Sequence, residues 1–135
     1  METKEKYFFV KEFEIPMFRC EICFIISNDH AKSMEYCNEK FFNTSNLSDW
    51  DDPGFTGVSQ AGEIFVCVQE LDICTIFHEI IHATRHVFET LNEYTDTKEF
   101  FAYISEFIFK NIIEFCAEKE LITITHNPKF QEDEK

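Results

Sequence analysis

The stretch EIFVCVQELDICTIFHEIIHATRHVFETL, Glu63 to Leu91, changes its hydrophobic pattern part-way and thereby indicates the fold class. Its beginning, Glu63–Gln69, is a β-branched and aromatic run, which favours a strand. After Asp72, whose side chain suits an N-cap, apolar residues recur at intervals of three and four. We therefore predict a strand followed by a helix from about Ile73 to about Leu91.

Two further strands are predicted upstream of this stretch. In FRCEICFIIS, residues 18–27, alternate residues are apolar while Arg19 and Glu21 fall on the other side, which is typical of a half-buried strand. The preceding KYFFVKEFEI, residues 6–15, is rich in aromatic and branched residues, and Pro16 follows it. We expect these two segments to be neighbouring strands.

Two more helices and a long loop complete the prediction. The segment SNDHAKSMEYCNEKFF, residues 27–42, starts with cap residues and carries one apolar face, and a Phe-rich helix spans about Thr97 to Ala117. The run from Asn43 to Gly62 contains all three glycines and reads as a loop. The order β, β, α, β, α, α predicts a single α+β domain over residues 1–135, with a small sheet, three helices and a flexible tail at 126–135.

Charge and hydropathy exclude several classes of function. The net charge is −14, and the acidic residues are spread along the chain, so we expect neither nucleic acid nor a membrane surface as a partner. No apolar run approaches the roughly 20 residues of a membrane span, and the N-terminal residues turn acidic where a signal peptide is apolar. These features predict an intracellular, cytoplasmic protein.

The six cysteines are interpreted as reduced core residues, because no secretion signal precedes them and most lie in apolar segments. Cys20 and Cys23 form a CxxC pair. A strand directs these two positions to opposite faces, so a shared metal ion is not expected there.

The sequence HEIIH within the second helix carries the strongest functional pattern. His78 and His82 lie off the apolar stripe on consecutive turns, so their imidazoles can converge on one zinc ion. Glu79 is then placed to accept a proton from a metal-bound water. The alternative is a solvated helix face on which this five-residue match arose by chance.

A catalytic zinc site usually has three protein ligands, so one more is needed. His86 sits two turns from His78, roughly 12 Å along the axis, and cannot join it on one ion. Glu99 is our candidate, because an antiparallel third helix would bring its first turns towards the histidines. Asp96–Glu99 also has the form of a capping box, which would turn Glu99 back onto its own backbone. Tyr103 is a candidate hydrogen-bond donor to an oxyanion, with an ordinary interhelical contact as the alternative.

The residues HEIIH, followed by EFFAY at 99–103, resemble small zincin-like metallopeptidases of phages and mobile elements, and more distantly the ImmA/IrrE metallopeptidases. The resemblance covers about Gly62 to Lys110. It implies a minimal zincin-like domain with HExxH on the central active-site helix, zinc on His78, His82 and Glu99, and Glu79 as the general base. It also implies that EIFVCVQ is an edge strand lining the substrate cleft.

We therefore expect a zinc-dependent metallopeptidase that cleaves a peptide or protein substrate, in the cytoplasm of the host cell if the chain is phage-encoded. The alternative is a non-catalytic zincin-like protein that binds or inhibits a host protein. A metal-free acidic domain is the third possibility. The sequence leaves the oligomeric state and the substrate open.

Overall fold

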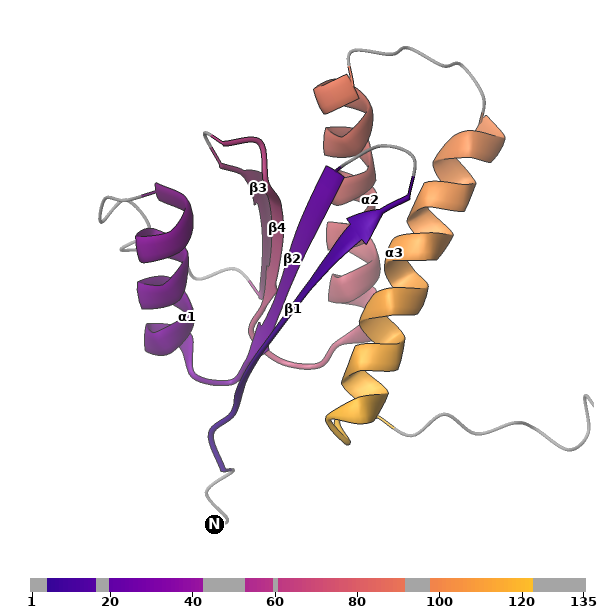
Figure 1. Cartoon of the computed structure of the whole chain (residues 1–135). Coiled ribbons are helices and arrows are strands. Elements are labelled where there is room, and N and C mark those ends of the chain that lie inside the picture. The colour runs from indigo at the N-terminus through magenta and orange to yellow at the C-terminus, as the bar shows by residue number, and fades with distance from the viewer. Residues whose placement is uncertain (1–4, 17–19, 43–52, 60, 92–97, 123–135) are drawn as a thin grey trace, which may run out of the picture.

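The computed structural model describes residues 5–16, 20–42, 53–59, 61–91 and 98–122, and Figure 1 shows their arrangement. The tail expected at 126–135 lies outside these residues. The strands are β1 (Phe8–Ile15), β2 (Cys20–Ser27), β3 (Gly54–Val58) and β4 (Ile64–Val68). The helices are α1 (His30–Cys37), α2 (Ile73–Leu91) and α3 (Lys98–Glu118). A π-helical turn over Asn38–Phe42 continues α1. Within this part of the chain, no helix has the length and apolarity needed to cross a bilayer.

The strands form one mixed sheet in the order β1-β2-β4-β3. β1 pairs with β2 and β3 with β4 in antiparallel fashion, whereas β2 and β4 are parallel. α2 and α3 pack against one face of the sheet and α1 against the other (Figure 1). The predicted α+β class, with a small sheet and three helices, is confirmed.

The predicted helix starts follow from their caps. The Asp72 side chain accepts hydrogen bonds from the Cys74 backbone N–H at 3.0 Å and from the Thr75 hydroxyl at 3.1 Å, so α2 begins at Ile73 as expected. Asp29 caps α1 in the same way through the Lys32 N–H. Each cap lies within three residues of the backbone group that it binds, so the sequence was sufficient to predict both helix starts.

The predicted loop from Asn43 to Gly62 needs correction, because strand β3 lies within it. Two of the five residues of β3 are glycines, which sequence reasoning counts as turn residues. In the sheet they permit close approach instead: a Cβ on Gly57 would lie 2.7 Å from Cζ of Phe65. The composition of this segment reflects tight packing as well as a turn.

The position of β4 also differs from the expected one. β4 is an internal strand with β2 on one side and β3 on the other, so the edge position that the resemblance implied for EIFVCVQ is wrong. β3 occupies that end of the sheet. The strand that borders α2 therefore comes from the segment that was predicted as a loop.

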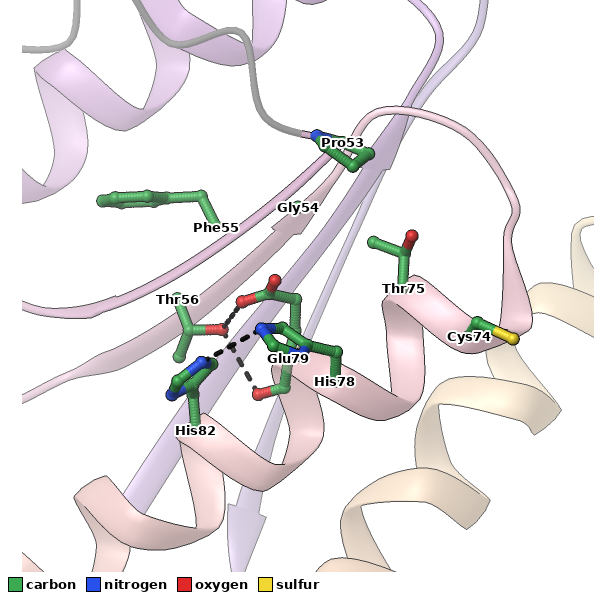
Figure 2. Close-up of a pocket in the computed structure, with 9 residues that line it drawn as sticks. All are labelled: Pro53, Gly54, Phe55, Thr56, Cys74, Thr75, His78, Glu79 and His82. Atoms are coloured by element: carbon green, nitrogen blue, oxygen red, sulfur yellow. Dashed lines mark hydrogen bonds between the residues drawn. The ribbon is translucent and has the colours of Figure 1, made fainter.

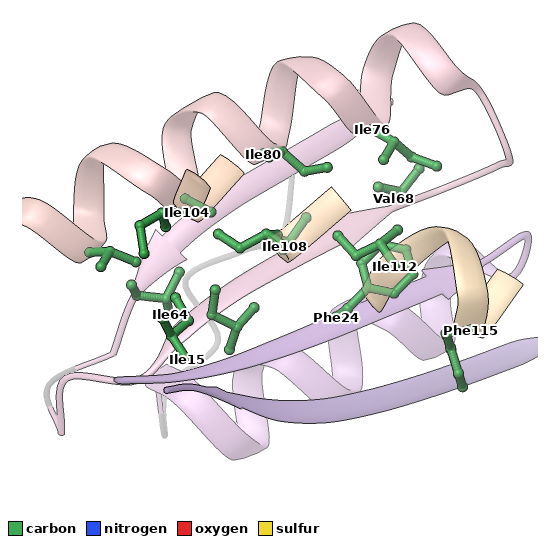
Figure 3. Packing of buried hydrophobic residues seen from close by; sticks show 14 of the residues in the cluster. Ile15, Phe24, Ile64, Val68, Ile76, Ile80, Ile104, Ile108, Ile112 and Phe115 are labelled. Atoms are coloured by element: carbon green, nitrogen blue, oxygen red, sulfur yellow. The ribbon is translucent and has the colours of Figure 1, made fainter. Parts of the chain in front are cut away.

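β2 is buried on both faces, whereas its alternating pattern predicted a half-buried strand. Phe24 packs beneath α2 and α3, and Cys23 and Ile25 are fully buried beneath α1. Figure 3 shows the larger core, in which Ile76 and Ile80 of α2 lie above the sheet beside residues of α3. The second buried face could not be recognised without knowing that α1 covers it.

All six cysteines are free, and five of them are buried as predicted. Cys20 lies in the core beneath α2 and α3, and Cys23 lies in the core beneath α1, so the CxxC pair does point to opposite faces of β2. Cys74 is the exception, because it is exposed near the start of α2.

Candidate metal centre

His78 and His82 lie one turn apart on the exposed side of α2, and their rings approach each other. Their Nε2 atoms are 3.2 Å apart, with ring planes inclined at 76°. Figure 2 shows both rings directed to the same side of the helix, towards β3. The predicted convergence of the two imidazoles is thus present in the structure.

The spacing of the two nitrogens suits a shared zinc ion. Zinc–imidazole bonds are about 2.0–2.1 Å long, so two nitrogens 3.2 Å apart subtend an angle of roughly 100° at the ion, near the tetrahedral value. The same distance also suits a hydrogen bond in which one neutral ring donates to the other. His78 and His82 therefore fit two positions of a zinc site.

Glu79 is turned away from solvent towards β3 and is only 6% exposed. The Thr56 hydroxyl donates a hydrogen bond to its Oε1 at 2.6 Å, and the same hydroxyl is 3.3 Å from the Glu79 carbonyl oxygen. A carboxylate removed from water is costly unless it is hydrogen-bonded, and Thr56 supplies such a bond. Glu79 is thus held between α2 and β3 next to the histidines (Figure 2).

These three side chains line an open cavity of about 540 Å³ between the start of α2 and β3. Its walls are formed by two segments that lie close together in space (Figure 2). One wall comes from Pro53, Gly54, Phe55 and Thr56, and the other from Cys74, Thr75, His78, Glu79 and His82. The HExxH motif therefore faces a cavity, as a metal site requires.

Gly54 and Thr56 are site residues that sequence reasoning missed. A Cβ on Gly54 would lie 2.7 Å from Cγ2 of Thr75, 2.8 Å from Cγ of Glu79 and 2.9 Å from its Oε2, so only glycine allows this contact between strand and helix. The available signal was the strand-forming residues Phe55, Thr56 and Val58. The two glycines among them outweighed it.

The third predicted ligand, Glu99, belongs to the first turn of α3, and its side chain lies outside the described residues. α2 and α3 are antiparallel as expected: Thr84 Oγ1 is 2.9 Å from Ser105 Oγ, and Phe88 stacks on Phe101. The first turn of α3 therefore lies beside Phe88, about 9 Å along α2 from His82 at 1.5 Å per residue. Among the described residues, no three His, Cys, Asp or Glu side chains are grouped to hold a metal ion.

Tyr103 and His86 lie apart from the cavity. Tyr103 is 69% exposed on α3 and is not among the residues that line the cavity. His86 places its Nδ1 3.3 Å from Oε2 of Glu89 instead of joining His82. The structure thus brings together His78, Glu79 and His82, and it does not bring Tyr103 to them.

Comparisons of the chain with protein-family models, with curated proteins and with solved structures gave no significant match.

Proposed function

We propose that this chain is a zinc-dependent metallopeptidase whose active site is the cavity between α2 and β3. The observation that carries the proposal is the pair of Nε2 atoms 3.2 Å apart beside the carboxylate of Glu79, in one cavity. A bound zinc ion would polarise a peptide carbonyl and lower the pKa of a water molecule towards neutrality. His78 and His82 would hold the ion, and Glu99 remains the proposed third ligand.

Glu79 is proposed as the general base. A base has to be within hydrogen-bond reach of the proton that it removes, and Glu79 lines the same cavity as both histidines. Its second function in this reaction would be to pass that proton to the leaving amine. Proton transfer by such a group typically contributes about 10²–10⁴-fold to the rate.

The edge of β3 that faces away from β4 supports a peptide as the substrate. The Gln69 N–H donates to the Pro53 carbonyl at 2.9 Å, and the Ser59 N–H donates to the Glu63 carbonyl at 2.8 Å. In an antiparallel ladder every second residue bonds to the partner strand, so Gly54, Thr56 and Val58 direct their backbone N–H and C=O groups away from β4. No described strand pairs with this edge.

An extended peptide added at this edge would therefore lie beside the cavity that Glu79 lines. Addition of a strand to an exposed sheet edge is a common mode of peptide recognition, because the backbone hydrogen bonds are independent of sequence. The side chain of Thr56 contacts Glu79, so the same residue of β3 borders both the strand edge and the proposed base. We accordingly propose peptides or proteins in extended conformation as the substrate class.

The deciding experiment compares wild type with Glu79→Gln. Both proteins are purified without added metal, their zinc content is measured by elemental analysis, and hydrolysis of fluorescein-labelled casein and of a mixed peptide library is followed. We expect about one zinc per chain in both proteins. Hydrolysis should fall by about 10²–10⁴-fold in the variant. Absence of zinc from wild type, or equal hydrolysis by both proteins, would exclude the proposal.

A non-catalytic binding protein is the second candidate, favoured by the acidic surface of a chain with a net charge of −14. Such a protein would engage a basic partner, proposed here as a host protein if the chain is phage-encoded. In that case Glu79→Gln would keep the biological effect of wild type.

Six free cysteines support a reducing compartment such as the cytoplasm for either function.

A further inference from the structure

We propose that Thr56 and Gly54 of β3 are positioning residues that hold the carboxylate of Glu79 in one orientation beside His78 and His82. The inference deepens the proposed function, because it matters for catalysis only if Glu79 is the base. Its structural part, that the strand fixes the carboxylate, stands on contacts between β3 and α2 alone. Separate experiments therefore test the two parts.

The hydroxyl of Thr56 has one proton to donate, and both nearby groups of Glu79 accept. The contact to Oε1, at 2.6 Å, is much shorter than the 3.3 Å contact to the carbonyl oxygen. The hydroxyl therefore donates its proton to Oε1 of the carboxylate. A distance of 2.6 Å lies within the ordinary range of O–H···O hydrogen bonds, whereas 3.3 Å lies beyond it. Thr56 therefore fixes Oε1.

Gly54 controls the other side of the same carboxylate. With a side chain at this position, Cβ would come within 2.8 Å of Cγ and 2.9 Å of Oε2 of Glu79, which is closer than packed atoms approach. Any other residue would therefore push the carboxylate away or separate β3 from α2. Thr56 thus donates a hydrogen bond to Oε1, and Gly54 leaves space for Oε2.

Thr56 also connects the base to the substrate-binding edge. Its side chain holds Glu79, while its backbone N–H and C=O point to the edge of β3 that faces away from β4. Thr56 would then position both the carboxylate of Glu79 and a peptide that is hydrogen-bonded to that edge. Small errors in such placement are expensive, since a displacement of about 1 Å can cost about 10²-fold in rate.

The first test needs neither metal nor substrate. Carboxylates of the 135-residue chain are coupled to glycine ethyl ester with a water-soluble carbodiimide. The labelling rate of Glu79 is read by peptide mass spectrometry against that of Glu89, whose side chain is 72% exposed. We expect slow labelling of Glu79 in wild type and in Thr56→Ser, which keeps the hydroxyl. Labelling should rise towards that of Glu89 in Thr56→Val and in Gly54→Ala.

The matched control is Thr84→Val, which removes the hydroxyl of a buried threonine. This hydroxyl donates to the Ile80 carbonyl and lies outside the cavity. This variant should lower the melting temperature and leave Glu79 labelling unchanged. If Thr56→Val and Gly54→Ala also leave the labelling at its wild-type rate, the strand does not fix the carboxylate and the proposal is overturned. Should Thr56→Val fail to fold, the labelling rate of Gly54→Ala is compared with that of Thr56→Ser. The proposal then requires faster labelling of Glu79 in Gly54→Ala and an unchanged rate in Thr56→Ser.

The second test measures casein hydrolysis by the zinc-loaded protein. Thr56→Val should lower kcat by about 10- to 100-fold with KM and zinc content unchanged, and Thr56→Ser should restore most of kcat. In the Glu79→Gln background, Thr56→Val should have no additional effect. An equal fall in both backgrounds would mean that Thr56 does not act through Glu79. If wild type lacks hydrolytic activity, the proposed function fails while the labelling result still decides whether the strand holds Glu79.

Discussion

His78 and His82 hold their Nε2 atoms 3.2 Å apart, whereas His86, one turn further along α2, turns to Glu89 with Nδ1 and Oε2 separated by 3.3 Å. Three histidines at equal spacing on one helix therefore divide into a converging pair and a third histidine that contacts Glu89. This division provides a control that lies on the same helix as the proposed ligands.

Replacing His82 by alanine should weaken zinc binding by more than about 10²-fold, since the loss of an outer partner of a ligand alone typically costs about 10–100-fold. His86→Ala should leave zinc binding unchanged, because His86 contacts Glu89 instead of the cavity. Competition with a chromogenic chelator measures both affinities. Equal effects of the two substitutions would show that the metal, if bound, is held elsewhere.

Glu99 has two predicted roles with different consequences. As a zinc ligand, its replacement by alanine should reduce the zinc content and affinity as strongly as His82→Ala does. As the Glu of a capping box, its replacement should remove one hydrogen bond, lower the free energy of unfolding by about 0.5–1.5 kcal/mol and leave zinc in place. Chelator competition and urea denaturation on the same preparation separate the two. Glu106→Ala, an exposed carboxylate on the same helix, is the control.

Cys74 should be the single fast-reacting thiol of the folded protein. The other five cysteines are buried, and burial raises the pKa of Cys23 to about 12 and of Cys116 to about 11, which suppresses their thiolates. Ellman's reagent should therefore titrate one thiol in the native protein and all six in 6 M guanidinium chloride. Cys74→Ser should remove the fast phase, and fast reaction of a second thiol in that variant would contradict the buried positions.

Stability should decline at alkaline pH for the same reason. Between the ordinary thiol pKa of 9.0 and the higher pKa of Cys23 in the folded protein, the unfolded chain has lost a proton that the folded chain retains. The free energy of unfolding should therefore fall as pH rises above about 9 and be insensitive to this thiol below about pH 8. Urea titrations at several pH values measure the slope. Cys23→Ala should make that slope shallower; an unchanged slope would refute this origin.

Gly57→Ala should destabilise the fold by about 1–3 kcal/mol, as overpacked substitutions do. The added Cβ would lie 2.7 Å from Cζ of Phe65, on the strand that pairs with β3. In a Phe65→Leu background the same substitution should cost less, because the smaller side chain relieves the clash. Chemical denaturation of the four proteins gives the comparison, and equal costs in both backgrounds would show that backbone effects dominate.

The helical part of the fold and the histidine pair were predictable because they depend on local geometry. Asp72 caps α2 from within its own turn, and His78 and His82 converge because residues four apart share a helix face. The sheet was less predictable. The residues of β2 do not reveal that α1 covers its second face, and the glycines of β3 resemble turn residues until Phe65 and Glu79 are known to lie against them.

The amino-acid sequence by itself specified an HExxH helix with an apolar stripe and two convergent imidazoles, since the 3.6-residue period fixes which side chains are neighbours. Tertiary structure alone decided that β3 is the strand beside α2 and that Thr56 binds Glu79 over a separation of 23 residues. Strand pairing joins segments that are distant along the chain, and only the packed sheet determines which of them meet.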